Sequence, residues 1–395
     1  MKNNINFLDL GLQPLANNYL SKKDLKKKEK KYRLKVGINL KTKLVSINKP
    51  ISSKIMFNNK YPYRSSMSKT MIKSFMDLSK FINKKFNPNK ILEIGSNDGS
   101  FIKNFSKKKV IGIEPCSNVE KITKKMGFNT YANYWDKKTA QKICKINGKV
   151  DLIYSANTIS HIQNLDEVFE AINIILNENG ILIIEDPSLL DCLKKNTYDQ
   201  FYNEHIYVFS LIGLENILKR HNLKIFHVQN LSIHGGSNRY FIKKNQNKRK
   251  KETSVKINRN KEIKYGLEKL STYKQFTKRV ISSKKTLKNI FKKINSKNKK
   301  IIGYGVTAKS TTILNYCKID NSLIEYFIDT TKDKQNKYTP GTKIPIYKYP
   351  GFIKDDVEFV FLGAWNFREE IFKKEKKFIK RGGKFIIHTP TPKII

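Results

Sequence analysis

The chain has 395 residues, of which 39% are hydrophobic, and its formal net charge is +46. This length exceeds what one ordinary core uses, so it predicts two or three domains, and the apolar fraction excludes a wholly disordered chain. Only nine of the 79 basic residues are Arg, which base recognition and bidentate phosphate contacts favour, so the charge alone does not predict a nucleic-acid partner.

The cysteines and the apolar segments restrict the protein class further. The four cysteines show no CxxC spacing, so they predict neither a metal site nor a disulfide framework. No apolar run approaches the roughly 18 residues that cross a bilayer, and the opening MKNNINFLDL lacks a secretory apolar segment. We therefore expect a cytoplasmic protein with reduced thiols and no membrane partner.

Residues 1–75 predict a small N-terminal module with a thin core of its own. The segment VGINLKTKLVSI, residues 36–47, alternates as β-strands do. At the end of the module, SKTMIKSFMDLSKFINKKF predicts a helix over residues 68–86. Its apolar residues recur at spacings of three or four: Met71, Phe75, Leu78 and Phe81.

The remaining chain predicts two α/β domains of the doubly wound, Rossmann-like class. Over residues 76–245, short apolar strands such as KILEIGSNDGSF, KVIGIEP and VDLIYSAN alternate with amphipathic helices, which is typical of a parallel sheet. Residues 246–299 are rich in Lys with helical periodicity and predict one long connecting helix. The alternation restarts over residues 300–395, which predicts a second, smaller α/β domain.

The segment ILEIGSNDGSF carries the sharpest local pattern. A strand leads into Gly95 and Gly99, with Glu93 just before the turn, and glycine there lets backbone amides approach a ligand. About twenty residues later the next strand ends at Glu114, whose carboxylate can accept from ribose hydroxyls. The pattern resembles the DxGxGxG loop of S-adenosylmethionine-dependent methyltransferases more than GxGxxG, with Asn97 in place of the middle glycine. A glycine turn without a ligand is the alternative.

Polar side chains at later strand ends are further candidates. Asn157 follows the strand VDLIYSA at the carboxyl edge of the sheet, where we expect it to contact the cofactor, and His161 lies one turn further. A structural role is the simpler alternative for His161. In IIGYGVTAKS, Gly303 and Gly305 follow a strand and Lys309 can reach a phosphate, although exposed lysines are common in this chain.

The segment FYNEHIYVF follows the strand ILIIEDPS and is expected to overhang the same cleft. His205 has the side chain of a general base at neutral pH, Glu204 can orient its neighbours, and the Tyr202 phenol can donate to an enolate oxygen. Buried aromatic packing is an equally simple interpretation of these residues alone.

Nine segments in this order resemble the nucleotide-sugar C-methyltransferases, which methylate keto-deoxyhexoses. The segments are DLGLQPLANNYL, YPYRSSMSKT, ILEIGSNDGSF, GIEP, NTISHI, YNEH, HGGSNRYF, GYGVTAKSTTILNYC and DKQNKYTPGTKIPI. The resemblance implies an N-terminal zinc-binding module, a central domain that binds S-adenosylmethionine, and a C-terminal Rossmann-like domain that helps to hold a nucleotide-diphosphate sugar.

The resemblance also implies roles for single residues. His205 matches the base that removes the proton beside the keto group, Tyr202 and Glu204 match its neighbours, and His161 and Tyr63 match polar groups around the sugar. The implied substrate-binding residues are His234, Gly235, Ser237, Gly303, Gly305 and Lys309.

One departure from the family concerns zinc. The first cysteine pair of the family would precede Phe7 and the second would fall near RLKVGINLKTKLV, and neither pair is present. Since a structural zinc site needs four ligands and this stretch has no Cys or His, we expect no zinc. Alternatives to C-methylation are O- or N-methylation of a sugar, a non-catalytic role beside sugar-modifying enzymes, and nucleic-acid binding.

Overall fold

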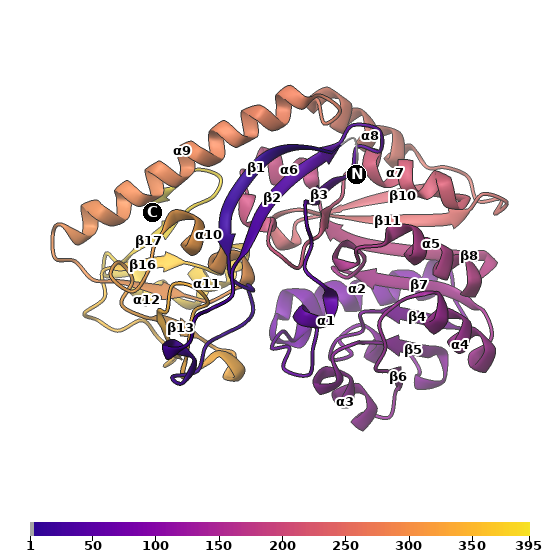
Figure 1. Ribbon diagram of the computed structural model, residues 1–395. Coiled ribbons are helices and arrows are strands. Elements are labelled where there is room, and N and C mark those ends of the chain that lie inside the picture. Colours follow the sequence, from indigo (N-terminus) through magenta and orange to yellow (C-terminus); the bar gives the residue numbers. More distant parts are fainter. Residues whose placement is uncertain (1–3) are drawn as a thin grey trace.

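A computed structural model describes residues 4–395, and within this range the strands form three sheets (Figure 1). Residues 1–3, which belong to the predicted N-terminal module, lie outside the described residues. No helix in the described part combines the length and the apolarity needed to cross a membrane.

The N-terminal sheet is antiparallel, and one of its strands comes from the middle of the chain. Its order is β1 (Asn4–Gln13), β2 (Tyr32–Asn39), β3 (Val45–Ile47) and β9 (Tyr207–Val208). The buried residues of β2 belong to a core that also contains side chains of α9 (Leu270–Asn295), and the Phe7 and Tyr273 rings lie 4.9 Å apart. The thin module therefore completes its core against the rest of the chain.

The central sheet has seven strands in the order β10-β11-β8-β7-β4-β5-β6. The strands from β8 to β6 are parallel, whereas β10 and β11 form an antiparallel edge. Their bounds are β4 (Ile91–Ile94), β5 (Val110–Ile113), β6 (Asn129–Tyr131), β7 (Val150–Ala156), β8 (Leu176–Pro187), β10 (Leu223–Leu231) and β11 (Ser237–Lys244). The chain order reverses between β4 and β7, which is where ligands bind in open α/β sheets.

Helices cover both faces of the central sheet. One face packs on α4, α5 and α7, and the other face packs on α2, which starts where the Ser68 side chain accepts from the Met71 N–H. These helices and their neighbours are α1 (Ser53–Met56), α2 (Lys69–Lys85), α3 (Ser117–Lys125), α4 (Lys137–Asn147), α5 (Leu165–Ile175), α6 (Leu189–Lys194) and α7 (Leu211–Leu218). The expected helix over residues 68–86 is thus present.

The C-terminal sheet repeats this plan on a smaller scale, in the order β14-β15-β13-β12-β16-β17-β18 with antiparallel strands at both edges. Its strands are β12 (Ile301–Tyr304), β13 (Phe327–Asp329), β14 (Lys337–Tyr338), β15 (Pro345–Lys348), β16 (Phe359–Leu362), β17 (Lys384–Ile387) and β18 (Lys393–Ile394). Its helices are α10 (Ala308–Cys317), α11 (Arg368–Lys374) and α12 (Lys376–Lys380). Two Rossmann-like sheets confirm the predicted fold class.

The connector differs from the single long helix that its periodicity predicts. It contains two helices, α8 (Thr253–Tyr265) and α9, and the first of them ends at Gly266, which has φ +85°. This left-handed conformation costs glycine little and stops an α-helix. The longer helix, α9, runs from the central domain to the C-terminal domain along the upper edge in Figure 1.

Candidate active site

A cavity of about 840 Å³ is lined by the N-terminal module, the carboxyl edge of the central sheet and the C-terminal sheet. This volume suits a small-molecule site. The structure brings most of the predicted site residues to its wall: Tyr63, Glu93, Gly95, Asn97, Glu114, Asn157, His161, Tyr202, Glu204, His205, His234, Gly305 and Lys309.

Four predicted site residues lie outside this lining: Gly99, Gly235, Ser237 and Gly303. A Cβ atom on Gly303 would overlap the Phe327 ring, and one on Gly235 would overlap the Trp365 ring. These two glycines therefore make room for aromatic side chains, which corrects the expectation that they approach a ligand.

Gly99 and Ser237 are also placed by packing and hydrogen bonding within the protein. A Cβ atom on Gly99 would lie 2.9 Å from the Thr123 methyl group. Ser237 begins β11, and its hydroxyl donates to the Ile233 carbonyl at 3.2 Å. Neither residue reaches the cavity, so the structure does not support a direct ligand contact for either.

The turn after β4 adopts a left-handed backbone at three positions, of which Gly95 and Asn97 line the cavity. Gly95 has φ +76° and Asn97 has φ +47°, and Asn tolerates this region better than most residues with a side chain. The Asn97 N–H donates to Glu114 at 3.0 Å, and its side chain accepts from the Ser65 N–H at 2.9 Å. Asn97 therefore keeps the backbone shape of the usual glycine and also fastens the segment around Tyr63 to the turn.

Two buried carboxyl groups stand beside this turn. Glu114 accepts from the N–H groups of Asn97 and Cys116, and burial still raises its pKa. Burial also raises the pKa of Glu93 well above its ordinary value, and the nearby carboxylates of Asp98 and Glu114 act in the same direction. The Glu93 Oε2 atom is buried without a hydrogen-bond partner, so this wall of the cavity can accept a donor from a ligand.

His205 lies within a cluster of rings. Its Nε2 atom is 2.6 Å from the Tyr202 hydroxyl, and its ring stacks on His161 at 5.0 Å between centroids. Burial lowers the pKa of His205 well below 6.5, and the nearby His161 and Lys309 side chains act in the same direction. Burial lowers the pKa of His161 to about 3. Both imidazoles are therefore neutral at physiological pH, the form in which a histidine can take up a proton.

Glu204 is held by two residues that the sequence patterns did not single out. Its carboxylate accepts from the Asn17 amide at 2.7 Å and from the Tyr61 hydroxyl at 3.0 Å. Burial nevertheless raises the pKa of Glu204 to about 7. Asn17 and Tyr61 lie in two of the motif segments, but no spacing rule connects residues so far from position 204 in the chain.

Lys309 and His234 line the cavity, and the Lys309 ammonium lies 5.5 Å from the centroid of the Trp365 ring. Lys309 is 8% exposed in the first turn of α10, and among residues 4–395 its ammonium makes no hydrogen bond or ion pair; burial lowers its pKa to about 8. His234 has φ +54°, and its Nε2 atom is buried without a partner. Such groups indicate a ligand, because burying an unpaired polar group is costly.

The described residues contain no group of three His, Cys, Asp or Glu that could hold a metal ion. Residues 1–57 contain neither Cys nor His. The absence of zinc from this protein stays a prediction.

Comparisons with known proteins agree with this arrangement of parts. Three family models match in series: "Putative zinc binding domain" over residues 1–57, "Methyltransferase domain" over residues 63–228, and "C-methyltransferase C-terminal domain" over residues 232–390. These matches, with the relative below, show an S-adenosylmethionine-dependent C-methyltransferase. A relative of this C-methyltransferase, C-methyltransferase NovU of Streptomyces niveus, is 26% identical over 99% of the chain and 94% of its own length.

Solved structures resemble part of the C-methyltransferase. An S-adenosylmethionine-dependent methyltransferase of Clostridium acetobutylicum is 15% identical, with a TM-score of 0.34, and covers 44% of this chain and 91% of its own. One of Anabaena variabilis is 18% identical, with a TM-score of 0.35, and covers 45% and 86%.

Proposed function

We propose that the protein transfers a methyl group from S-adenosylmethionine to a carbon atom of a nucleotide-linked keto-deoxysugar, with His205 as the base. The observation that carries the proposal is the neutral imidazole of His205, which shares one cavity with the glycine turn after β4 and with the unpaired ammonium of Lys309. A base, a place for the methyl donor and a place for an anionic substrate are thus combined in one space.

The residues beside β4 suit the methyl donor. Glu114 ends β5 next to the turn, where its carboxylate can accept from ribose hydroxyls, and the free oxygen of Glu93 can accept from an ammonium group. Gly95, Asn97 and Asn157 expose backbone and amide groups on the same wall. When bound there, S-adenosylmethionine supplies an electrophilic methyl group to which a carbon nucleophile can bond.

His205 removes the proton from the carbon beside the keto group. The electron pair of the C–H bond becomes the enolate, and the proton stays on the imidazole. The Tyr202 hydroxyl contacts the His205 ring and can donate to the enolate oxygen, which stabilises the charge that develops there. His161 stacks behind His205 and fixes the plane of its ring.

Lys309 supports an anionic substrate. The Lys309 side chain is buried and its ammonium makes no hydrogen bond or ion pair within residues 4–395, so it gains from a ligand with negative charge, and the diphosphate of a nucleotide sugar has that charge. Gly305 and His234 line the cavity beside it. Tyr63 lines the same cavity beside the turn after β4, where its carbonyl accepts from the Asn97 side-chain amide.

The proposal is tested by incubating the purified protein with methyl-labelled S-adenosylmethionine and a panel of nucleotide-linked 4-keto deoxysugars. We expect label in one sugar and a carbon-linked methyl signal in its NMR spectrum. An oxygen- or nitrogen-linked methyl group would contradict the carbon nucleophile. Binding of S-adenosylmethionine by calorimetry without turnover of any sugar or related acceptor would indicate a non-catalytic protein.

A further inference from the structure

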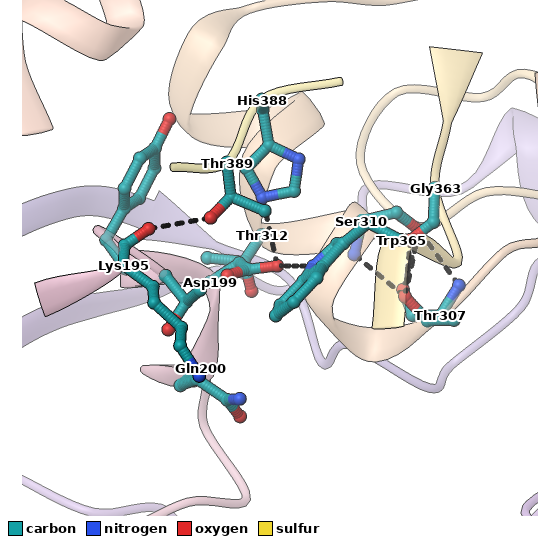
Figure 2. Close-up of polar contacts among 12 residues, drawn as sticks. Lys195, Asp199, Gln200, Thr307, Ser310, Thr312, Gly363, Trp365, His388 and Thr389 are labelled. Atoms are coloured by element: carbon teal, nitrogen blue, oxygen red, sulfur yellow. Dashed lines mark hydrogen bonds and ion pairs between the residues drawn. The ribbon is translucent and has the colours of Figure 1, made fainter. Parts of the chain in front are cut away.

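A buried cluster joins the segment 195–205, which leads to His205, to the C-terminal domain. Asp199 lies six residues before His205, and its Oδ2 atom accepts from the Trp365 indole N–H at 2.6 Å and lies 3.2 Å from His388 Nε2 (Figure 2). Trp365 follows β16 and His388 follows β17, so both partners of Asp199 come from the C-terminal sheet. Asp199 and His388 have no exposed surface.

This cluster is a costly way to hold two domains together. A buried carboxylate loses its hydration, and an apolar contact of the same size often stabilises a fold at least as well. Among the described residues, the Asp199 Oδ1 atom is also buried without a hydrogen-bond partner. What the polar contacts provide in addition is direction, because two donors fix the orientation of one carboxylate.

The same segment contacts the turn at residues 233–236, which places His234 at the cavity. The Gln200 side chain donates to the His234 carbonyl at 2.7 Å, and the Trp365 ring fills the space that Gly235 leaves beside it. Lys195 donates to the Gly235 carbonyl at 2.6 Å. The positions of the turn at 233–236 and of the segment around Asp199 are therefore linked.

A third contact fastens the start of this segment. Thr389 is the residue after His388, and its hydroxyl donates to the Lys195 carbonyl at 2.7 Å (Figure 2). The segment is thus attached to the strand end at 388–389 and to Trp365 before it turns into Tyr202 and His205.

We propose that Asp199, Trp365 and His388 are positioning residues, through which the C-terminal domain sets the place of His205 and His234 in the cavity. This inference rests on the proposed function for the role of His205. None of the three residues lines the cavity, so they act through the segment and not by touching a ligand. A displacement of about 1 Å in a catalytic group can lower a rate about 100-fold.

The test compares Trp365→Phe, Asp199→Asn and the double variant with the unaltered protein. Trp365→Phe removes the N–H donor and also shortens the ring system, whose outer atoms lie nearest Gly235 and which the Lys309 ammonium faces. Asp199→Asn keeps that ring and changes only the carboxylate. Tyr273→Phe is the matched control, because it removes a buried hydroxyl that donates to the Leu267 carbonyl at 2.7 Å and lies outside the cavity lining. Thermal unfolding and calorimetry with S-adenosylhomocysteine establish that each variant is folded and binds on the cofactor side.

The first measurement needs no sugar substrate. In Trp365→Phe and Asp199→Asn we expect faster hydrogen exchange of the backbone amides at 200–209 and 233–236, with affinity for S-adenosylhomocysteine within about twofold of the unaltered protein. In Tyr273→Phe these amides should exchange at the unaltered rate. Unchanged exchange in the two cluster variants, or an equal increase over the whole chain, would overturn the positioning role.

The second measurement uses the nucleotide-linked sugar that the unaltered protein methylates. We expect kcat to fall about 10-fold in Trp365→Phe and about 100-fold in Asp199→Asn, with KM for S-adenosylmethionine unchanged. The double variant should lose no more than Asp199→Asn, because both changes break the same contact. A kcat within twofold in the single variants would refute the inference. If no sugar is methylated by the unaltered protein, the proposed function fails, and the exchange rates still decide whether the cluster positions the segment.

Discussion

In both α/β sheets a backbone N–H that follows one strand donates to an acid at the end of the neighbouring strand. The two sheets differ in the charged side chains with which they line the cavity. In the central sheet the Asn97 N–H donates to Glu114 at the end of the neighbouring strand, and in the C-terminal sheet the Val306 N–H donates to Asp329 at 2.7 Å in the same relation. From residue 69 to residue 244 the lining contains four acids and no Lys or Arg: Glu93, Glu114, Asp136 and Glu204. The C-terminal lining has two acids, Asp329 and Glu370, and three lysines, Lys309, Lys334 and Lys374.

The different charged residues indicate that two sheets with the same backbone arrangement can bind different ligands. Asp329 lies 3.7 Å from the Lys334 ammonium, so its charge is compensated within its own sheet. Within residues 4–395 the Glu93 carboxyl forms no ion pair, and its Oε2 atom is buried without a hydrogen-bond partner. Buried acids favour a cationic ligand and an unpaired lysine favours an anionic one. The central half therefore suits the sulfonium and ammonium groups of S-adenosylmethionine, and the C-terminal half suits a diphosphate.

We expect the largest effect from His205→Ala. This variant tests whether the base that removes the substrate proton comes from the central domain. We expect the rate of methyl transfer to fall about 10²- to 10⁴-fold, because this is what a positioned general base contributes. Affinity for S-adenosylmethionine should stay nearly unchanged by calorimetry. His227→Ala is the matched control, since His227 contacts Ser254 outside the cavity. Full turnover in His205→Ala would show that another group is the base.

A pH experiment on Glu204 measures the effect of burying an acid in the central half. Since its folded-state pKa is about 7 and its ordinary value is 4.5, the folded protein holds this proton more tightly between these two pH values. Glu204 therefore lowers stability as the pH rises through this window, and its contribution is constant above it. Glu204→Gln removes the effect.

The free energy of unfolding of Glu204→Gln, relative to the unaltered protein, should increase by about 2 to 3 kcal/mol from pH 5 to pH 8. Urea unfolding at both pH values measures it. Glu369→Gln is the control, because this side chain is exposed and lies outside the cavity lining. A relative stability that does not depend on pH would mean that Glu204 is not buried as an acid.

Much of this arrangement could be predicted from the sequence, since local patterns carry it. The strand, glycine turn and acid of ILEIGSNDGSF and GIEP place Gly95 and Glu114 correctly at the cavity, because the carboxyl ends of adjacent parallel strands meet at one edge. Gly303 could not be assigned in this way. Gly303 leaves room for the Phe327 ring, and a sequence does not distinguish a glycine that faces a ligand from one that faces a side chain.

Long-range contacts were beyond such patterns. Asn17 reaches Glu204 across 187 residues, and Trp365 reaches Asp199 across 166 residues. Periodicity also failed at Gly266, because the helical pattern continues on both sides of a residue that ends the helix. Polar contacts between domains depend on how whole sheets dock, which no spacing rule describes.

A reciprocal pair of variants sharpens the charge comparison. Glu114→Ala should weaken S-adenosylhomocysteine about 10- to 100-fold, since a charged acceptor contributes about 1.5 to 3 kcal/mol, and it should leave the binding of a nucleoside diphosphate unchanged. Calorimetry with each ligand alone measures both affinities. If Glu114→Ala weakened both ligands equally, the two halves would not be separate binding sites.

Lys309→Met tests the other half. We expect the nucleoside diphosphate to bind about tenfold more weakly, because one charged contact is lost, while S-adenosylhomocysteine binds as before. Lys376→Met is the control, because Lys376 is exposed and outside the lining. An equal loss in Lys376→Met would mean that the general positive charge of the chain, and not the buried lysine, attracts the diphosphate.

The smallest expected effect concerns the donors that the N-terminal part of the chain gives to Glu204. The Asn17 amide and the Tyr61 hydroxyl both lower the pKa of this carboxyl, and they oppose its burial. Asn17→Ala and Tyr61→Phe should each raise the pKa of Glu204 further above about 7, with the larger change in Asn17→Ala. An NMR titration of ¹³C-labelled glutamate carboxyl groups measures the shift. A fall in this pKa would show that water replaces the lost donors, and the N-terminal module would then have no part in setting the acid of the central half.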